Sequence, residues 1–134
     1  GSVSVEIALS GEKIKVYAIE KNPEGVELIR QNRKKFRVDG IRIIEGNAPE
    51  VLEGLEMPTH VFIGGSSGNL RQIIEKVTAA NPEVKIVLNA ISLETLGEVM
   101  ELSKDGLLKE IQEKRRLCNL LGVTAGLFLT ILIL

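Results

Sequence analysis

The chain has few of the residue types that most often mark a chemical site. Its 134 residues include one cysteine, one histidine, one tyrosine, three phenylalanines and no tryptophan. A single cysteine, Cys118, excludes an internal disulfide and fits a reducing compartment, so we expect a cytoplasmic protein. Without a Cys/His cluster we expect no metal site, and without a Ser/His/Asp set we expect no hydrolase of that type. His60 begins an apolar run and is expected to be structural.

The chain also has no excess of charge of either sign. Seventeen lysines and arginines stand against 18 acidic residues, which gives a net charge of −1, and no basic run is interleaved with aromatics. Nucleic acid is therefore not an expected partner, because its binding depends on basic surfaces. With 44% hydrophobic residues, a chain of this length can form one domain with a modest core.

Short apolar runs alternate with helical segments along the chain. Four runs rich in valine and isoleucine have the composition of buried parallel strands: residues 14–20, 41–45, 60–63 and 84–90. Strands that alternate with helices imply crossover connections within one sheet. The sequence therefore predicts an α/β fold with a doubly wound, mostly parallel sheet.

The segments between these runs carry helix signals. Asn22 is expected to cap a helix over residues 23–36, with Pro23 at its first position. The next long helix has an apolar stripe formed by Leu70, Ile73, Ile74 and Val77. The last begins after the cap Ser92 and has a looser stripe formed by Leu93, Leu96 and Met100. A short helix is also expected over residues 48–55.

The first twenty residues have the spacing of part of a nucleotide-binding motif. A helix is expected directly after Gly1, and Glu20 ends the first strand. In doubly wound folds a glycine turn precedes the first helix, and an acidic residue about 20 positions later accepts the hydroxyls of a ribose. Gly1 and Glu20 have this spacing, although the strand and the other glycines that should precede Gly1 are absent. The alternative for Glu20 is an ordinary charged residue at the end of a strand.

Two asparagines follow strands of the predicted sheet. Asn47 comes after Gly46, and its amide could face an adenine edge because it offers both a donor and an acceptor. It could also cap the short helix that follows, and the two roles are compatible. Asn89 ends the last regular strand, at the edge where open α/β sheets bind ligands, or else it only helps the chain to turn.

A loop of glycines and serines joins the third strand to its helix over residues 64–69. Exposed backbone N–H groups at a helix N-terminus attract anions, so we expect this loop to face a ligand that carries carboxylates or phosphates. No Gly-Lys-Ser/Thr sequence follows, so it is not a Walker loop. The alternative is a flexible connection with a serine cap.

The tail differs from the rest of the chain. Residues 117–134 carry no charge and follow the basic residues 114–116. This length reaches the lower limit of a membrane span, but polar residues and glycines dilute it, and residues 127–134 have strand character. We favour a buried strand, while a membrane or interfacial anchor and an unstructured end remain open.

Five segments together resemble one family, the decarboxylating precorrin-6Y methyltransferases of cobalamin biosynthesis, in the subunit or domain that methylates C-15. The segments are residues 1–6, 17–23, 45–49, 62–66 and 89–96. The resemblance implies a Rossmann-like class I methyltransferase domain over residues 1–108, followed by a divergent segment over 109–134. The sequence departs from the family pattern at Asn47, where Asp is usual in the family.

The resemblance implies S-adenosyl-L-methionine as methyl donor, a tetrapyrrole as acceptor and often a homotetramer. The implied cofactor-binding residues are Gly1, Glu20, Lys21, Asn47, Ala48 and Gly64. The implied substrate-binding residues are Gly65, Ser66, Ser67 and Asn89. No residue is assigned to catalysis. The alternatives are an inactive remnant or interaction module of the same fold, and a methyltransferase that acts on another small molecule.

The absent first strand would lie at the centre of the sheet, between the strands that end at Glu20 and Ile63. Each buried N–H or C=O group left unpaired there would cost about 1–3 kcal/mol, too much for a domain with a net stability of about 5–15 kcal/mol. The only unassigned segment with strand character is 127–134. We therefore predict that the tail packs into or onto the sheet.

Overall fold

The computed structural model describes residues 2–66, 68–89, 92–107 and 125–132. Gly1, Ser67 and most of the segment that follows residue 107 lie outside this part. The described elements, in chain order, are α1 (Ser2–Leu9), β1 (Lys13–Glu20), α2 (Pro23–Lys35), β2 (Ile41–Glu45), the 3-10 helix η1 (Glu50–Leu52), β3 (His60–Ile63), α3 (Leu70–Ala80), β4 (Lys85–Leu88), α4 (Leu93–Lys104) and β5 (Ala125–Leu132).

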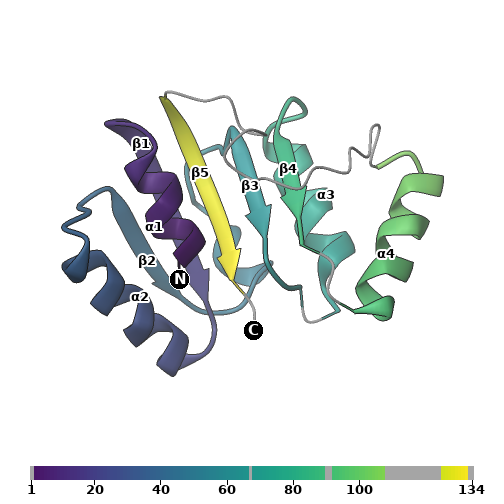
Figure 1. The fold of residues 1–134 in the computed structure, drawn as a ribbon. Coiled ribbons are helices and arrows are strands. Elements are labelled where there is room, and N and C mark those ends of the chain that lie inside the picture. The colour runs from purple at the N-terminus through teal and green to yellow at the C-terminus, as the bar shows by residue number, and fades with distance from the viewer. Residues whose placement is uncertain (1, 67, 90–91, 108–124, 133–134) are drawn as a thin grey trace.

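The described strands form one parallel sheet in the order β2-β1-β5-β3-β4 (Figure 1). The strand β5, drawn in yellow, comes last in the chain but lies between β1 and β3. The predicted α/β class and the predicted insertion of the tail into the sheet are both confirmed. The strand β5 pairs on one side with β1, which ends at Glu20, and on the other with β3, which ends at Ile63.

Two apolar cores cover the two faces of the sheet. Because side chains alternate along a strand, Tyr17 and Ile19 of β1 pack with α3 and α4, while Val16 and Ala18 pack with α1 and α2. Both faces of β1 are therefore buried, which explains why residues 16–20 show no polar alternation.

The helix starts mostly follow the sequence signals. The side chain of Asn22 accepts the N–H of Glu24 at 3.0 Å, and that of Ser92 accepts the N–H of Thr95 at 3.1 Å, so both predicted caps are confirmed. The predicted stripe of α3 is also confirmed, since all four of its members are buried: Leu70, Ile73, Ile74 and Val77.

Two element predictions are wrong. The helix expected over 48–55 is reduced to η1, and Gly54, which has a positive φ of 77°, lies just beyond it where the chain leaves the helical conformation. In α4 the expected stripe faces outward, with Leu93 87% exposed, whereas Val99 and Leu102 are the buried residues. The helix thus packs on the sheet through a face other than the expected one.

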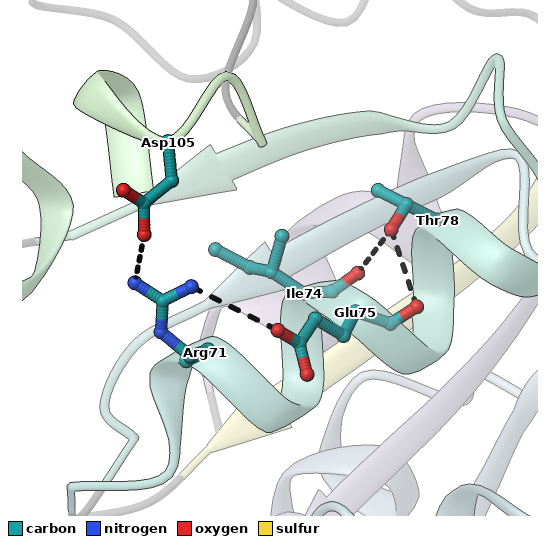
Figure 2. Close-up of polar contacts among 5 residues, drawn as sticks. All are labelled: Arg71, Ile74, Glu75, Thr78 and Asp105. Atoms are coloured by element: carbon teal, nitrogen blue, oxygen red, sulfur yellow. Dashed lines mark hydrogen bonds and ion pairs between the residues drawn. The ribbon is translucent and has the colours of Figure 1, made fainter. Parts of the chain in front are cut away.

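Ion pairs on the outer side of α3 link it to the end of α4. Figure 2 shows the guanidinium of Arg71 between the carboxylates of Asp105, just after α4, and Glu75, one turn further along α3. The hydrogen bond that Arg71 donates to the carboxylate of Asp105 raises the pKa of Arg71. All three side chains are about half exposed, so this network adds little to stability.

Among the described residues, no helix has both the length and the apolarity to cross a bilayer.

Candidate functional site

The carboxyl ends of the strands meet at one edge of the sheet, here called the ligand edge. Glu20 is level with Glu45 of β2 and with Leu132 of β5, and Ile63 of β3 is level with Ile131. Gly64 therefore follows β3 at the level of Glu20, two strand spacings or about 10 Å away. The described candidate residues all lie at this edge: Glu20 is the last residue of β1, and the others are in the loops that follow the strands.

Glu20 is a buried carboxylate at the start of α2. It is only 1% exposed, and its Oε1 accepts the backbone N–H of Asn22 at 2.8 Å. The positive end of the α2 dipole favours a negative charge at this place. The neighbouring carbonyl of Glu20 accepts the N–H of Gly46, which ties the loop after β2 to the same point.

Gly25 makes room for that carboxylate. A Cβ at position 25 would lie 2.7 Å from the Cδ of Glu20, closer than real Cβ contacts come. The first turn of α2 thus closes directly over Glu20 and holds its side chain in one place. The carboxylate therefore has a structural role at the start of the helix, and its role toward a ribose stays a prediction.

The loop after β2 is fixed by its own side chains. Asn47 donates from Nδ2 to the Oε2 of Glu50 at 3.1 Å, and its carbonyl accepts the N–H of Val51. The capping role that the sequence left open is not what these bonds supply, because the N-cap position of η1 is Pro49 and no side chain caps that helix. Ala48 is completely buried in the core formed with α3, so any contact it makes with a ligand would be through its backbone.

The glycine and serine loop is tied to the loop after β2 by Asn69. The Nδ2 of Asn69 donates to the carbonyl of Ala48 at 3.2 Å, and its N–H donates to the carbonyl of Ser66 at 2.9 Å. The helix cap is therefore Asn69 and not a serine, although its side chain makes no capping bond because it is engaged with Ala48. Ser66 is 3% exposed, while Gly64 and Gly65 are half-buried.

The remaining candidates lie at the rim of the edge or outside the described residues. Asn89 is exposed, and its N–H donates to the carbonyl of Ile63 at 2.9 Å, which sets it beside the glycine loop. Lys21 is exposed directly after Glu20. Gly1 and Ser67 lie outside the part of the chain that the structure describes.

His60 stands at the opposite end of β3. It is 7% exposed, and burial followed by the charge of Lys85 lowers its pKa from the usual 6.5. Its ring Nδ1 lies 2.9 Å from the hydroxyl oxygen of Thr59. Since β3 runs from His60 to Ile63, this histidine is away from the ligand edge, as the sequence predicts. The described residues contain no cluster of three or more His, Cys, Asp or Glu that could hold a metal ion.

The site also depends on residues that sequence reasoning missed or gave a lesser role. Gly25 and the N–H of Asn22 hold Glu20, and Asn69 joins two loops. A glycine in the first turn of a helix, five residues after an acidic strand end, was the available signal for the first contact. The contact of Asn69 with the loop after β2 has no sequence signal, because the partner of Asn69 is a backbone carbonyl 21 residues away.

An open parallel sheet, helices on both faces and polar loops at its carboxyl edge define a Rossmann-like, doubly wound α/β protein. Within that class, a family model described as the precorrin methyltransferase domain matches residues 1–125. The chain belongs to this family. The predicted division into 1–108 and 109–134 stays a prediction, since residues 108–124 are outside the described part.

Individual relatives agree with the family. The probable cobalt-precorrin-6B C(15)-methyltransferase (decarboxylating) of Sulfolobus acidocaldarius is 43% identical over 120 residues, 84% of this chain and 60% of the relative. The cobalt-precorrin-6B C(15)-methyltransferase (decarboxylating) of Salmonella typhimurium is 37% identical over 101 residues, 75% of this chain and 52% of the relative. The chain thus spans little more than half the length of these relatives.

A solved structure shows the same fold. The precorrin-6y C5,15-methyltransferase of Geobacter metallireducens GS-15 superposes with a TM-score of 0.64 at 42% identity, and the match covers 68% of this chain and 49% of that one. The resemblance to the methyltransferases of cobalamin biosynthesis is confirmed by sequence and by fold.

Proposed function

We propose that this chain binds cofactor and acceptor in a decarboxylating precorrin C-15 methyltransferase of cobalamin biosynthesis. S-adenosylmethionine would supply an electrophilic methyl group, and CO₂ would leave the C-12 acetate of the acceptor. The observation that carries the proposal is the buried carboxylate of Glu20, fixed at the ligand edge in a chain of this family. A cytoplasmic homo-oligomer is part of the same proposal.

The residues at this edge fit the cofactor chemically. A carboxylate has about four acceptor sites, and the N–H of Asn22 takes one of them at Glu20. Because Glu20 is 1% exposed, its other acceptors would reach the ribose hydroxyls only after the first turn of α2 moves away from it. The half-buried amide of Asn47 suits the adenine edge, beside Lys21 and the backbone of Ala48. Gly64 has no side chain to fill the space beside β3, where the methionine end would lie.

The acceptor would lie over the other half of the edge. Gly65 and Ser66 present backbone groups of the loop before α3, and Asn89 presents an exposed amide beside them. N–H groups and amides suit the carboxylates of a precorrin. No described side chain is needed as acid or base for this role, because a correctly held pair of reactants can gain most of the rate from position.

The cofactor site is tested by calorimetry with S-adenosylhomocysteine. Glu20→Gln removes the charge and keeps the shape, and we expect it to weaken binding about tenfold or more, because hydrogen bonds to a charged group are the stronger ones. The matched control is Glu45→Gln, an exposed residue level with Glu20 on the next strand, which should change affinity less than about twofold. Equal affinities of the parent chain, Glu20→Gln and Glu45→Gln for S-adenosylhomocysteine would refute the cofactor site.

The acceptor site is tested by methyl transfer to the precorrin from labelled S-adenosylmethionine. Ser66 is a poor position for an added charge, because aspartate would be buried there, so the exposed Asn89 is used. Asn89→Asp should raise KM by repelling the acceptor and leave S-adenosylhomocysteine binding unchanged. Gln72→Glu, an exposed residue of α3, makes the same charge change elsewhere. Binding of the cofactor product without any transfer would favour the inactive remnant instead.

A further inference from the structure

A second site lies at the far end of α2, away from the ligand edge. There the end of α2, the turn after it and the edge strand β2 line a wide, open pocket of about 850 Å³, here called the basic pocket. Its charged lining residues are Arg30, Arg33, Lys34, Arg37, Asp39 and Arg42. Five cationic groups and one anionic group give the pocket a charge of +4, while the whole chain has a net charge of −1.

We propose that the basic pocket binds a small anion that carries several phosphate or carboxylate groups. Its cations come from three separate elements, so the helix dipole explains only part of the cluster. Basic residues in the last turn of α2 stabilise its negative end, but Arg37 lies beyond the helix and Arg42 lies on β2. Four of the five cations are arginines, whose planar fork matches the oxygens of phosphates and carboxylates.

The cations of the basic pocket are only partly neutralised within the chain. Arg30 lies 3.8 Å from the carboxylate of Glu27, and Arg33 donates to the carbonyl of Ile41 at 3.2 Å. Among the described residues, Lys34 and Arg37 make no ion pair. Like charges gathered in one hollow repel one another, and a multivalent anion would relieve that repulsion.

Arg37 occupies a backbone position that suits glycine. Its φ is +51°, and the turn is closed by the N–H of Val38, which donates to the carbonyl of Arg33 at 3.0 Å. Helices commonly end in this way with glycine in the left-handed position, because a side chain there is strained. A strained arginine lining a basic pocket is typical of a residue kept for binding at some cost in stability.

The pocket favours a small ligand over nucleic acid. Its volume is within the range of small-molecule sites, and none of its lining residues is aromatic, so it offers no surface on which bases could stack. The pocket does not depend on the proposed function, because it is built from the opposite end of α2.

Calorimetry of the whole chain with tripolyphosphate and, separately, citrate tests the site. Lys34→Gln should weaken binding about tenfold, since a charge-assisted hydrogen bond is lost. Lys35→Gln is the matched control, because Lys35 is the next residue of the same helix and does not line the pocket, and it should change affinity less than about twofold. The anion that binds more tightly identifies the ligand class: tripolyphosphate indicates a phosphate-bearing ligand, and citrate indicates a carboxylate-bearing one.

Arg37→Gly separates binding from folding. Glycine accepts the positive φ, so the melting temperature should stay within about 3 °C of the parent chain, while anion affinity falls about tenfold. Three results would each overturn the proposal: no binding of either anion, equal losses in Lys34→Gln and Lys35→Gln, or binding of a long polyanion such as heparin without tripolyphosphate or citrate.

Discussion

At the scale of single residues, Gly25 is constrained by the buried carboxylate of Glu20. Gly25→Ala would gain about 1 kcal/mol of helix propensity, but its Cβ would overlap the Glu20 side chain, and overpacking costs about 1–3 kcal/mol. Since Glu20 would also lose its bond to Asn22, we expect a net loss of stability in urea unfolding. Gly97→Ala in α4 meets nothing within 4 Å and should stabilise the chain by about 0.5–1 kcal/mol.

The contact between Gly25 and Glu20 can also be tested by a double-mutant cycle. If the overlap is the cause, Gly25→Ala should cost much less in a chain that already carries Glu20→Ala. A cost that is the same in both backgrounds would show that Gly25 is needed for another reason.

His60 makes stability depend on pH. Burial and the charge of Lys85 lower the pKa of His60 in the folded chain, so the unfolded chain takes up this proton first as the pH falls. The contribution of His60 to the free energy of unfolding is fully present above pH 6.5, the pKa of histidine in the unfolded chain. It is lost progressively as the pH falls below that value. His60→Gln should flatten the curve of unfolding free energy between about pH 5 and pH 7. An unchanged slope would show that other groups cause the dependence.

At the scale of elements, α4 tests which face of a helix packs on the sheet. Leu102 is 1% exposed and Leu96 is 47% exposed. Leu102→Ala should therefore cost about 2–4 kcal/mol of unfolding free energy, while the identical change at position 96 should cost less than about 1 kcal/mol. Chemical unfolding of the two variants checks the pair, and the reverse order would support the stripe expected from the sequence.

The strands and helices were more predictable than the faces they present. The apolar runs and caps located β1 to β4, α2 and α3, because burial on both faces of a strand and a stripe on a helix leave local patterns. In α4 both faces carry apolar residues, so only the position of the sheet decides between them. At the ligand edge, the order of Glu20, Asn47, Gly64 and Asn89 was predictable from strand ends, but the burial of Glu20 depends on how α2 closes over it.

At the scale of the whole molecule, the sheet is continuous only because β5 joins its two halves. It pairs with β1 over residues 125–132 and with β3 over residues 128–131. Without it, β1 and β3 would each present unpaired backbone groups at the centre of the fold. The last strand of the chain thus decides whether the ligand edge, which both halves supply, is held together at all.

Hydrogen exchange of the backbone tests this arrangement. Residues 128–131 have partners on both sides, so consecutive N–H groups should be protected by about 10³-fold or more, as for other core amides. In the edge strand β4, which pairs only with β3, every second N–H faces away from the sheet and should exchange much faster. Protection that does not change on dilution would show that β5 comes from the same chain. Exchange of residues 128–131 within seconds would mean that the sheet closes without them.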